Sequence, residues 1–354
     1  MPFVPGGPVG QLLAYLPAAL GGWLCSLLNV PLAWLIGALL VTAALNVTGH
    51  ALPVSAVGRR TGQLVLGIAI GLFFTPVTVA ALMDNVGAML FAGAFVLVLG
   101  CLAGLLLLRM TGIDWPTAYF ASVPGGAAEM ALMAERHGGS GAPVAFAQAL
   151  RVGIIVTLVP PAITWSGVAG VPDLVTRSTH FDPIGLAALM AMAVVAAVLA
   201  AKARLPNAWL LGPMTLSAAI TGYGLTLSTI PPILIASSQV LLGTSLGAMF
   251  SRDTLRGARG FFTATMVGNV VLLGACLGLG LLGTLVVEAP FASMILATAP
   301  GGVTEMSITA KALHLDVALV SAFHVVRIFM IVPTTPLVFQ GLHWLGARLS
   351  ARRT

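Results

Sequence analysis

Long apolar runs separated by short polar segments make up most of this chain. In the first half they cover residues 10–28, 30–48, 61–82, 86–108 and 143–169, and in the second half residues 183–202, 206–222, 232–250, 261–287 and 317–343. A predominantly apolar run of about 20 residues is long enough to cross the ~30 Å hydrocarbon core of a bilayer as a helix. The pattern therefore predicts an all-α, polytopic membrane protein with ten transmembrane helices.

A Pro-Gly-Gly sequence interrupts this pattern between the fourth and fifth runs of each half. The two segments read VPGGAAEMALMAERHG at 123–138 and APGGVTEMSITAKALH at 299–314. Non-helical backbone is tolerated at membrane depth only where protein or a water-filled cavity surrounds it, and glycine has no Cβ to restrict a turn. We expect each segment to be the tip of a re-entrant hairpin with two short helical arms and a cavity at the tip.

The two halves of the chain resemble each other well beyond these tips. VPLAWLIGAL at 30–39 matches LPNAWLLGPM at 205–214, and GQLVLGIAIG at 62–71 matches SQVLLGTSLG at 238–247, at offsets of 175 and 176 residues. Similarity at a nearly fixed spacing predicts an internal duplication. We expect two membrane repeats, residues 1–175 and 176–354, with the boundary inside the polar stretch at 171–183.

The distribution of Lys and Arg predicts how the repeats are oriented. If each Pro-Gly-Gly segment returns to the side from which it entered, twelve of the 16 basic residues share one face and two lie opposite. Twelve full crossings divide the loop residues seven against seven instead. Because cytoplasmic loops carry an excess of Lys and Arg, we favour five crossings plus one re-entrant hairpin in each repeat. The repeats are then inverted, as in many secondary transporters, with both termini cytoplasmic and residues 171–181 outside.

The candidate site residues recur in both halves. They are Pro124, Gly125, Gly126, Glu129 and Arg151 in the first half, Pro300, Gly301, Gly302, Glu305 and Arg327 in the second, and the pair Gln63 and Gln239. An arginine inside a membrane span must pair, reach the interface or line a wet path. One interpretation is a shared cavity in which the arginines bind an anionic solute and the glutamates carry a coupling proton or cation.

Structural interpretations of the same residues stay open. Each arginine follows its glutamate by 22 residues, so Glu–Arg ion pairs would fasten each hairpin to the next helix. Each glutamate would otherwise compensate the helix dipole at the hairpin tip. The glycines that follow Gln63 and Gln239 at the fourth and eighth positions are also typical of close helix packing. Gln148 and its counterpart His324, one turn before the arginines, indicate local hydrogen bonding, although a histidine can titrate near neutral pH.

Composition and charge narrow the function classes. Hydrophobic residues make up 58% of the chain and charged residues 7%, against roughly 25% charged residues in a soluble domain. No basic stripe indicates nucleic-acid binding. The first residues, MPFVPGGPVGQ, lack a basic segment typical of a cleaved signal peptide, so we expect a retained N-terminus. The three cysteines lie in apolar runs without metal-binding spacing, and we expect neither a metal nor a cofactor.

The chain resembles a known family at several motifs. The P-x-x-W-L-x-G segments at 31–37 and 206–212, the PGG-x-x-EM motifs and the trailing Arg151 and Arg327 resemble the bacterial AbrB duplication family, often labelled ammonia monooxygenases or AbrB-family regulators. The resemblance covers nearly the whole chain. It implies a fold similar to cation/proton antiporters and anion transporters built from inverted repeats, with bacterial citrate symporters as the closest analogy for the hairpins. It also implies the bacterial inner membrane and an effect on gene expression.

Three function classes follow from these observations. A secondary transporter of a small, anionic solute, coupled to protons or cations, is favoured because the sequence contains no ATP-binding segment. The alternative is a membrane-embedded regulator or sensor, although the sequence contains no soluble signalling domain. An ammonia monooxygenase is disfavoured because no His and Glu set has the spacing of copper or iron ligands, so we expect no enzyme. The expected partners are the unidentified solute, its coupling ion and the lipid bilayer, without nucleic acid, and a homo-oligomer stays open.

Overall fold

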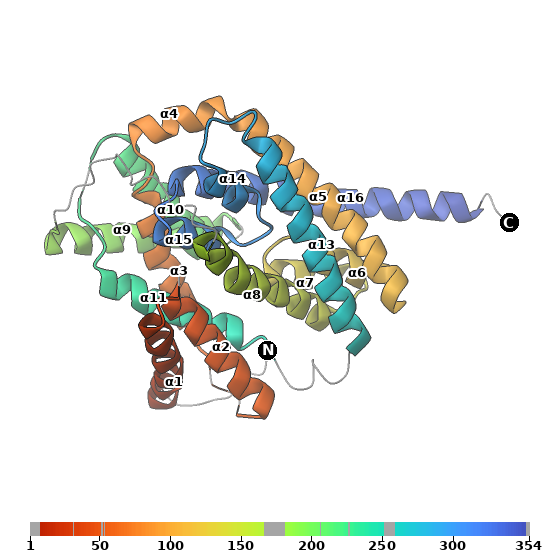
Figure 1. Ribbon diagram of the computed structural model, residues 1–354, viewed down its shortest axis with the longest axis horizontal. Coiled ribbons are helices and arrows are strands. Elements are labelled where there is room, and N and C mark those ends of the chain that lie inside the picture. Colours follow the sequence, from red (N-terminus) through yellow and green to blue (C-terminus); the bar gives the residue numbers. More distant parts are fainter. Residues whose placement is uncertain are drawn as a thin grey trace.

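The computed structural model of the chain describes residues 8–30, 32–50, 52, 54–165, 181–205, 207–225, 227–250 and 259–351. The first half forms α1 (Pro8–Leu27), α2 (Ala33–Thr48), α3 (Ala56–Gly71), α4 (Pro76–Asp84), α5 (Val86–Thr111), α6 (Trp115–Ser122), α7 (Ala127–Arg136) and α8 (Gly141–Trp165). The second half forms α9 (Pro183–Lys202), α10 (Ala208–Gly222), α11 (Pro232–Gly247), α13 (Arg259–Gly283), α14 (Phe291–Thr298), α15 (Val303–Ala312) and α16 (Val317–Ala351) (Figure 1). No strand occurs within these described ranges, and the all-α prediction is confirmed.

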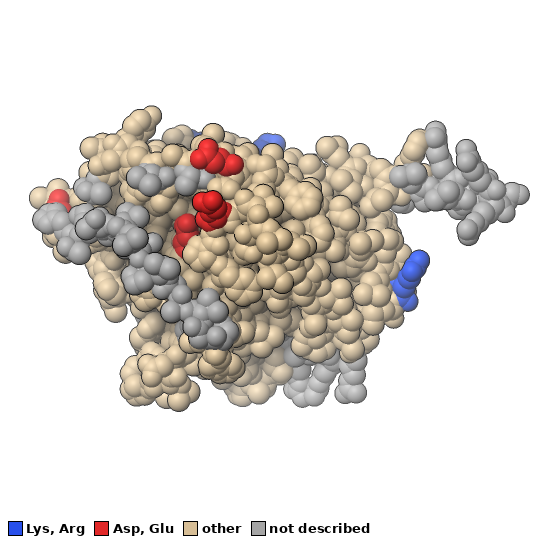
Figure 2. Space-filling model, turned by 45° about the horizontal axis from the view of Figure 1, so that its top comes forward, with Lys and Arg blue, Asp and Glu red and all other residues tan. Residues whose placement is uncertain are grey.

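Five helices of the described part are long and apolar enough to cross a membrane. They cover Val86–Thr111, Gly141–Trp165, Pro183–Lys202, Gly260–Gly283 and Val317–Leu342. Large apolar side chains such as Val195 and Leu199 on α9 are exposed on the molecular surface. The face drawn in Figure 2 carries only a few charged side chains among many uncharged ones. Such a surface is consistent with a protein that lies in a bilayer.

Four shorter helices, α2, α3, α10 and α11, have 15 or 16 residues each. At a rise of about 1.5 Å per residue they are ~24 Å long, less than the full hydrocarbon core. Each makes its most extensive contact with a short helix of the other half, α2 with α11 and α3 with α10. The outer helices follow the same pattern in both halves, since α1 packs on α2 and α9 packs on α10.

Glycines allow the short helices to approach closely. A Cβ on Gly67 of α3 would lie 2.5 Å from the carbonyl oxygen of Leu210, and a Cβ on Gly247 of α11 would lie 2.5 Å from that of Leu39. No real Cβ tolerates such distances, so only glycine permits this spacing of the helices. The glycines that follow Gln63 and Gln239 therefore serve helix packing.

The structure breaks one run that the sequence predicted to be a single crossing. The run 61–82 is divided, because α3 ends at Gly71 and α4 begins at Pro76. Proline lacks an N–H and fits the first turn of a helix but not its interior. The Thr75 side chain accepts a hydrogen bond from the Thr78 N–H at 3.4 Å and caps the new helix. The predicted repeat boundary at 171–183 lies largely outside the described residues.

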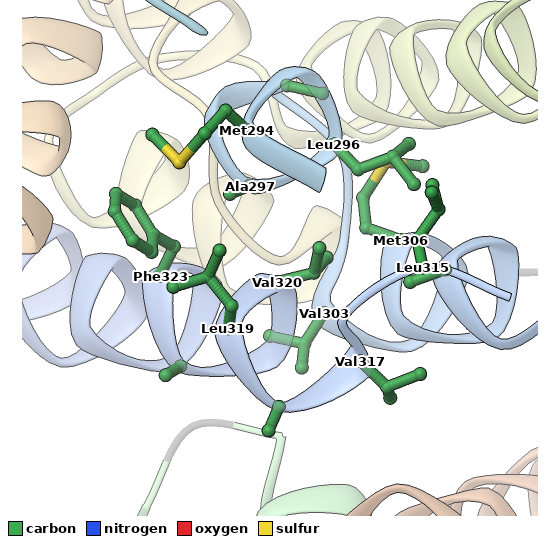
Figure 3. Packing of buried hydrophobic residues seen from close by; sticks show 14 of the residues in the cluster. Met294, Leu296, Ala297, Val303, Met306, Leu315, Val317, Leu319, Val320 and Phe323 are labelled. Atoms are coloured by element: carbon green, nitrogen blue, oxygen red, sulfur yellow. The ribbon is translucent and has the colours of Figure 1, made fainter. Parts of the chain in front are cut away.

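Two helix pairs carry the Pro-Gly-Gly segments, α6 with α7 and α14 with α15, and α16 packs against both. Figure 3 shows the second pair, whose residues Leu296, Val303 and Met306 belong to one buried apolar cluster with Val320 of α16. In the first pair the Tyr119 hydroxyl donates a hydrogen bond of 2.9 Å to the carbonyl oxygen of Thr335. The rings of Trp115, Tyr119 and Phe120 also contact that of Phe339.

Candidate functional site

A cavity of about 130 Å³ lies between the two Pro-Gly-Gly segments. Its lining comes from both halves and includes Pro124, Gly125, Gly126, Glu129, Arg151, Pro300, Gly301, Gly302, Glu305, Arg327, Gln63, Gln148, Arg59, Asn207, Ser245 and Thr304. Its formal charge is +1 when both glutamates are ionised, because Arg59, Arg151 and Arg327 oppose Glu129 and Glu305. The structure thus brings together every candidate site residue except Gln239.

The first glycine of each tip makes room for a buried methionine. A Cβ on Gly125 would lie 2.5 Å from Cε of Met130, and a Cβ on Gly301 would lie 2.8 Å from Cγ of Met306. Both methionines are completely buried. Glycine and methionine of the PGG-x-x-EM motif are therefore linked by packing in both halves.

The second glycine of each tip lies beneath a carboxylate. A Cβ on Gly126 would collide with Oε2 of Glu129, and one on Gly302 would collide with Oε2 of Glu305. Gly126 and Gly302 are also the N-cap residues of α7 and α15, and neither helix has a side-chain cap. Each carboxylate therefore lies at a helix N-terminus, where the positive end of the helix dipole stabilises a negative charge.

Arg151 binds the other helix end at the first tip, the C-terminus of α6. Only 2% of this residue is exposed, and its Nη2 donates to the carbonyl oxygens of Ala121 and Ser122 at 2.9 and 2.8 Å. Its Nη1 donates to Gln148 Oε1 at 2.9 Å and its Nε to Asn269 Oδ1 at 3.1 Å. The last carbonyls of α6 have no partner within the helix, so the guanidinium caps its C-terminus.

Gln148 completes this cap. Its Nε2 donates to the carbonyl oxygens of Phe120 and Val123 at 2.9 and 2.8 Å. Together, Gln148 and Arg151 bind every carbonyl oxygen from Phe120 to Val123. The local hydrogen bonding that the sequence indicated for Gln148 is present.

Arg327 holds the second tip in a related way. Its Nη1 donates to the carbonyl oxygen of Ala299 at 2.7 Å, and its Nη2 donates to that of Gly301. His324, the counterpart of Gln148, instead has Nδ1 2.9 Å from the carbonyl oxygen of Val320. Its Nε2 is buried and makes no well-formed hydrogen bond within the described part of the chain, although the ring interacts with the backbone of Ala299.

The Glu–Arg ion pairs that the sequence spacing allowed are not formed. Arg151 and Arg327 instead donate hydrogen bonds to backbone carbonyl oxygens, and Arg151 also to Gln148 and Asn269. Each arginine does fasten a hairpin to the following helix, but through the backbone of the first arm. The ion-pair interpretation was therefore right that each arginine attaches a hairpin to the next helix, but wrong that a glutamate is its partner. The unpaired carbonyl oxygens at a helix C-terminus attract a cation as a carboxylate does.

The two glutamines have different surroundings. Gln63 Nε2 donates a hydrogen bond of 2.8 Å to Asn207 Oδ1, and both residues line the cavity between the tips. Gln239 lines a second cavity instead. The geometry therefore separates this residue from the other candidates.

Sequence reasoning missed several polar residues of the lining. Asn207 aligns with Leu32 in the two matching segments. The polar side chain at a position that is apolar in the other half could have marked Asn207 as a candidate for the lining. Asn269 lies within an apolar run and orients Arg151. Arg59 is one of the twelve basic residues that the five-crossing arrangement puts on the cytoplasmic face, and it lies near the start of α3 and lines the cavity. Among the residues that the structure describes, no three His, Cys, Asp or Glu side chains gather at a common metal position.

Comparison with known proteins identifies the family of this chain. The sequence profile described as "Transition state regulatory protein AbrB" matches residues 34–343. The chain belongs to the AbrB family. It is 28% identical to "Uncharacterized protein YhjN" of Bacillus subtilis (strain 168) over 359 aligned positions, covering 93% of this chain and 92% of that protein. It is also 27% identical to "Putative regulator AbrB" of Escherichia coli (strain K12), covering 91% of this chain and 93% of that protein. The family resemblance read from the PGG-x-x-EM motifs of this AbrB-family chain is thus confirmed.

Proposed function

We propose that this AbrB-family protein is a secondary transporter that binds a small anionic solute between its two Pro-Gly-Gly tips. The observation that carries the proposal is the cavity itself, which both halves line with the same motif. Transporters built from inverted repeats bind their solutes at the repeat interface, where interrupted helices direct their ends at the solute. The N-termini of α7 and α15 lie at such a position.

The proposal includes two inverted repeats, each with five crossings and one re-entrant hairpin. The packing of α2 with α11 and of α3 with α10 supports this arrangement. In the repeat α2 corresponds to α10 and α3 to α11, so a two-fold axis between the halves converts one of these contacts into the other. The basic loops then lie in the cytoplasm. We place the protein in the bacterial inner membrane with both termini on the cytoplasmic side.

The size and charge of the cavity narrow the class of solute. An apolar protein cavity of about 150 Å³ holds a molecule the size of benzene, so 130 Å³ fits a solute of about six non-hydrogen atoms. One monovalent anion neutralises the formal charge of the lining. Arg327 donates two hydrogen bonds to the tip, and a guanidinium has five N–H groups. Arg327 therefore retains donors for a carboxylate or an inorganic anion.

Glu129 and Glu305 are the proposed carriers of the coupling ion. Neither carboxylate pairs with the buried arginines, and both line the cavity. Binding of a proton or a cation to a carboxylate adds positive charge beside the anion. The solute and the coupling ion would therefore favour each other's binding.

A thermal-shift screen of the purified protein in detergent tests this proposal. Small carboxylates, inorganic monovalent anions and, as a control class, amines are added one at a time. A ligand at 100 times its Kd stabilises a protein by about 2.7 kcal/mol, so a solute of the proposed class raises the unfolding midpoint. Uptake of that solute into proteoliposomes, driven by a proton or sodium gradient, then tests transport. Stabilisation by amines alone would overturn the anionic assignment, and binding without uptake would overturn the transport role.

The alternative is a membrane-embedded regulator or sensor. It is favoured by the names of the family profile and of the Escherichia coli relative, both of which refer to regulation. A sensor and a transporter would both bind a solute, but only a transporter moves it. A deletion strain with altered transcription and unchanged solute flux would favour the sensor.

A further inference from the structure

A second cavity, of about 270 Å³, lies beside α3, α11 and α15. It is lined by Leu66, Ala69 and Ile70 of α3, Phe73 just after this helix, Ile235 and Gln239 of α11, and Ser307, Ile308, Lys311, Ala312, His314 and Val317. This is the cavity that contains Gln239. Its polar residues include Lys311, whose Nζ lies 5.8 Å from the centroid of the Phe73 ring.

The linings of the two cavities correspond residue by residue. At the 176-residue offset of the repeat, four residues of the second cavity at the end of α3 or just after it match four of the first at the end of α11 or just after it. Leu66, Ala69, Ile70 and Phe73 correspond to Leu242, Ser245, Leu246 and Met249. Gln239 in the second cavity likewise matches Gln63 in the first. The first cavity thus uses the beginning of α3 and the end of α11, and the second uses the end of α3 and the beginning of α11.

This exchange places the cavities at opposite ends of one helix pair. Helices α3 and α11 are in contact, and the beginning of one meets the end of the other at each cavity. The pair is therefore antiparallel in this region. If the pair crosses the membrane, one cavity lies toward each side.

A thin apolar layer separates the two cavities. Leu66, Leu242 and Ile308 belong to one buried cluster and are 1%, 5% and 3% exposed. Leu242 lines the first cavity, whereas Leu66 and Ile308 line the second. On α15 residues one turn apart line different cavities, because Glu305 lines the first and Ile308 the second.

We propose that the second cavity is the access path to the solute site from the outer side of the membrane, and that Leu66, Leu242 and Ile308 close it. This inference rests on the proposed transport function. The first cavity, with Arg59 at its rim, is then the path from the cytoplasm. Lys311 and His314 would lie at the outer mouth, where a basic side chain attracts an anion. Movement of the α3–α11 pair relative to α15 would open one path and close the other.

The matched residues Ala69 and Ser245 provide a test that requires no knowledge of the solute. Cys25, Cys101 and Cys276 are first replaced by Ala, and Ala69→Cys or Ser245→Cys is then introduced singly. A membrane-impermeant thiol reagent is applied to right-side-out and inside-out membrane vesicles. We expect Ala69→Cys to react only in right-side-out vesicles and Ser245→Cys only in inside-out vesicles. Ala193→Cys is the matched control, because Ala193 is completely buried and lines neither cavity, and it should not react in either.

Reaction of both cysteines from the same side, or no reaction of Ala69→Cys from either side, would overturn the inference. If either variant loses the thermal unfolding transition of the parent, Ile70→Cys and Leu246→Cys provide a second matched pair. The result is distinguishable from failure of the transport proposal. If both cysteines react from the same side but the protein transports a solute, only the access path is refuted. If they react from opposite sides but the protein neither binds nor moves any solute, only the transport function is refuted.

The layer itself is tested by Ile308→Ser. Loss of the apolar side chain should join the two cavities and raise the passive anion permeability of proteoliposomes at least several-fold. Leu189→Ser is the control, because Leu189 is equally buried in a different cluster. Equal permeability of the Ile308 variant and the parent would contradict the assignment of the layer.

Discussion

Arg327 donates a hydrogen bond of 2.7 Å to the carbonyl oxygen of Ala299, the residue immediately before the second Pro-Gly-Gly. Ala299 is the C-cap of α14, so its carbonyl lies at the negative end of that helix. Glu305 lies at the opposite kind of end, in the first turn of α15. Each charge is thus stabilised by a helix end and not by the other charge. The first half repeats this arrangement with Arg151 and Glu129.

This arrangement predicts that glutamate and arginine contribute independently to stability. Arg151→Met leaves the carbonyls of Ala121 and Ser122 without their partner, at about 1–3 kcal/mol each, whereas Glu129→Gln should change stability by less than ~1 kcal/mol. The double variant should be as unstable as Arg151→Met alone. A double-mutant cycle on unfolding in detergent measures the coupling, which should stay below ~0.5 kcal/mol. Recovery of stability in the double variant would restore the ion-pair interpretation.

The adjacent glycines of each tip should respond differently to the same substitution. Gly125→Ala forces a Cβ against buried Met130, and overpacking of this kind typically costs about 1–3 kcal/mol. Gly126→Ala meets only the end of the flexible Glu129 side chain, so the fold should survive while the carboxylate moves. We expect Gly125→Ala to lower the unfolding midpoint and Gly126→Ala to lower solute uptake instead.

Gly278→Ala is the control for both glycine variants, because a Cβ at that position of α13 meets no atom within 4 Å. It should leave both the unfolding midpoint and uptake near those of the parent. Gly302→Val, with its stiff branched side chain, should impair uptake more than expression. Normal uptake by Gly126→Ala and Gly302→Val would remove the tips from the site.

Much of the site was predictable because proline, glycine and charge are rare and informative in an apolar chain. The Pro-Gly-Gly breaks and the two buried arginines could be read directly from the sequence. The partners of the arginines could not, because a backbone carbonyl freed at a helix end has no sequence signature. Nor does the 22-residue separation of Glu129 and Arg151 specify the direction of either side chain.

Gln239 illustrates a different limit. Equivalent residues of a duplicated protein meet only where they lie close to the axis that relates the halves. Arg151 and Arg327 line one cavity, whereas Gln63 and Gln239, each near the middle of its helix, line different cavities. Sequence similarity shows which residues of the two halves are equivalent, but it does not show how far either residue lies from the axis. The break at Pro76, by contrast, was visible in the sequence but was overridden by the apolar run around it.

The difference between Gln148 and His324 predicts unequal effects of substitution. Gln148→Leu removes the donors to Phe120 and Val123 and should destabilise the protein by about 2–4 kcal/mol, because the carbonyls stay buried and unpaired. His324→Gln replaces a ring whose Nε2 makes no well-formed hydrogen bond among the described residues, although the ring interacts with the backbones of Val320 and Ala299. It should keep or raise the unfolding midpoint, by up to ~1 kcal/mol. Unfolding in detergent measures both, and a larger loss for His324→Gln than for Gln148→Leu would contradict the assignment.

The membrane topology of this AbrB-family protein separates the five-crossing repeat from the twelve-span alternative. With five crossings and a hairpin in each repeat, position 175 is outside and position 350 is cytoplasmic, whereas with twelve spans both positions lie on one side. Val175→Cys and Ser350→Cys in the cysteine-free chain are therefore labelled separately with an impermeant thiol reagent on intact cells and on inside-out vesicles. We expect Val175→Cys to react on intact cells and Ser350→Cys only in inside-out vesicles. Reaction of both on the same side would mean that each Pro-Gly-Gly segment crosses the membrane, and the inverted arrangement would be lost.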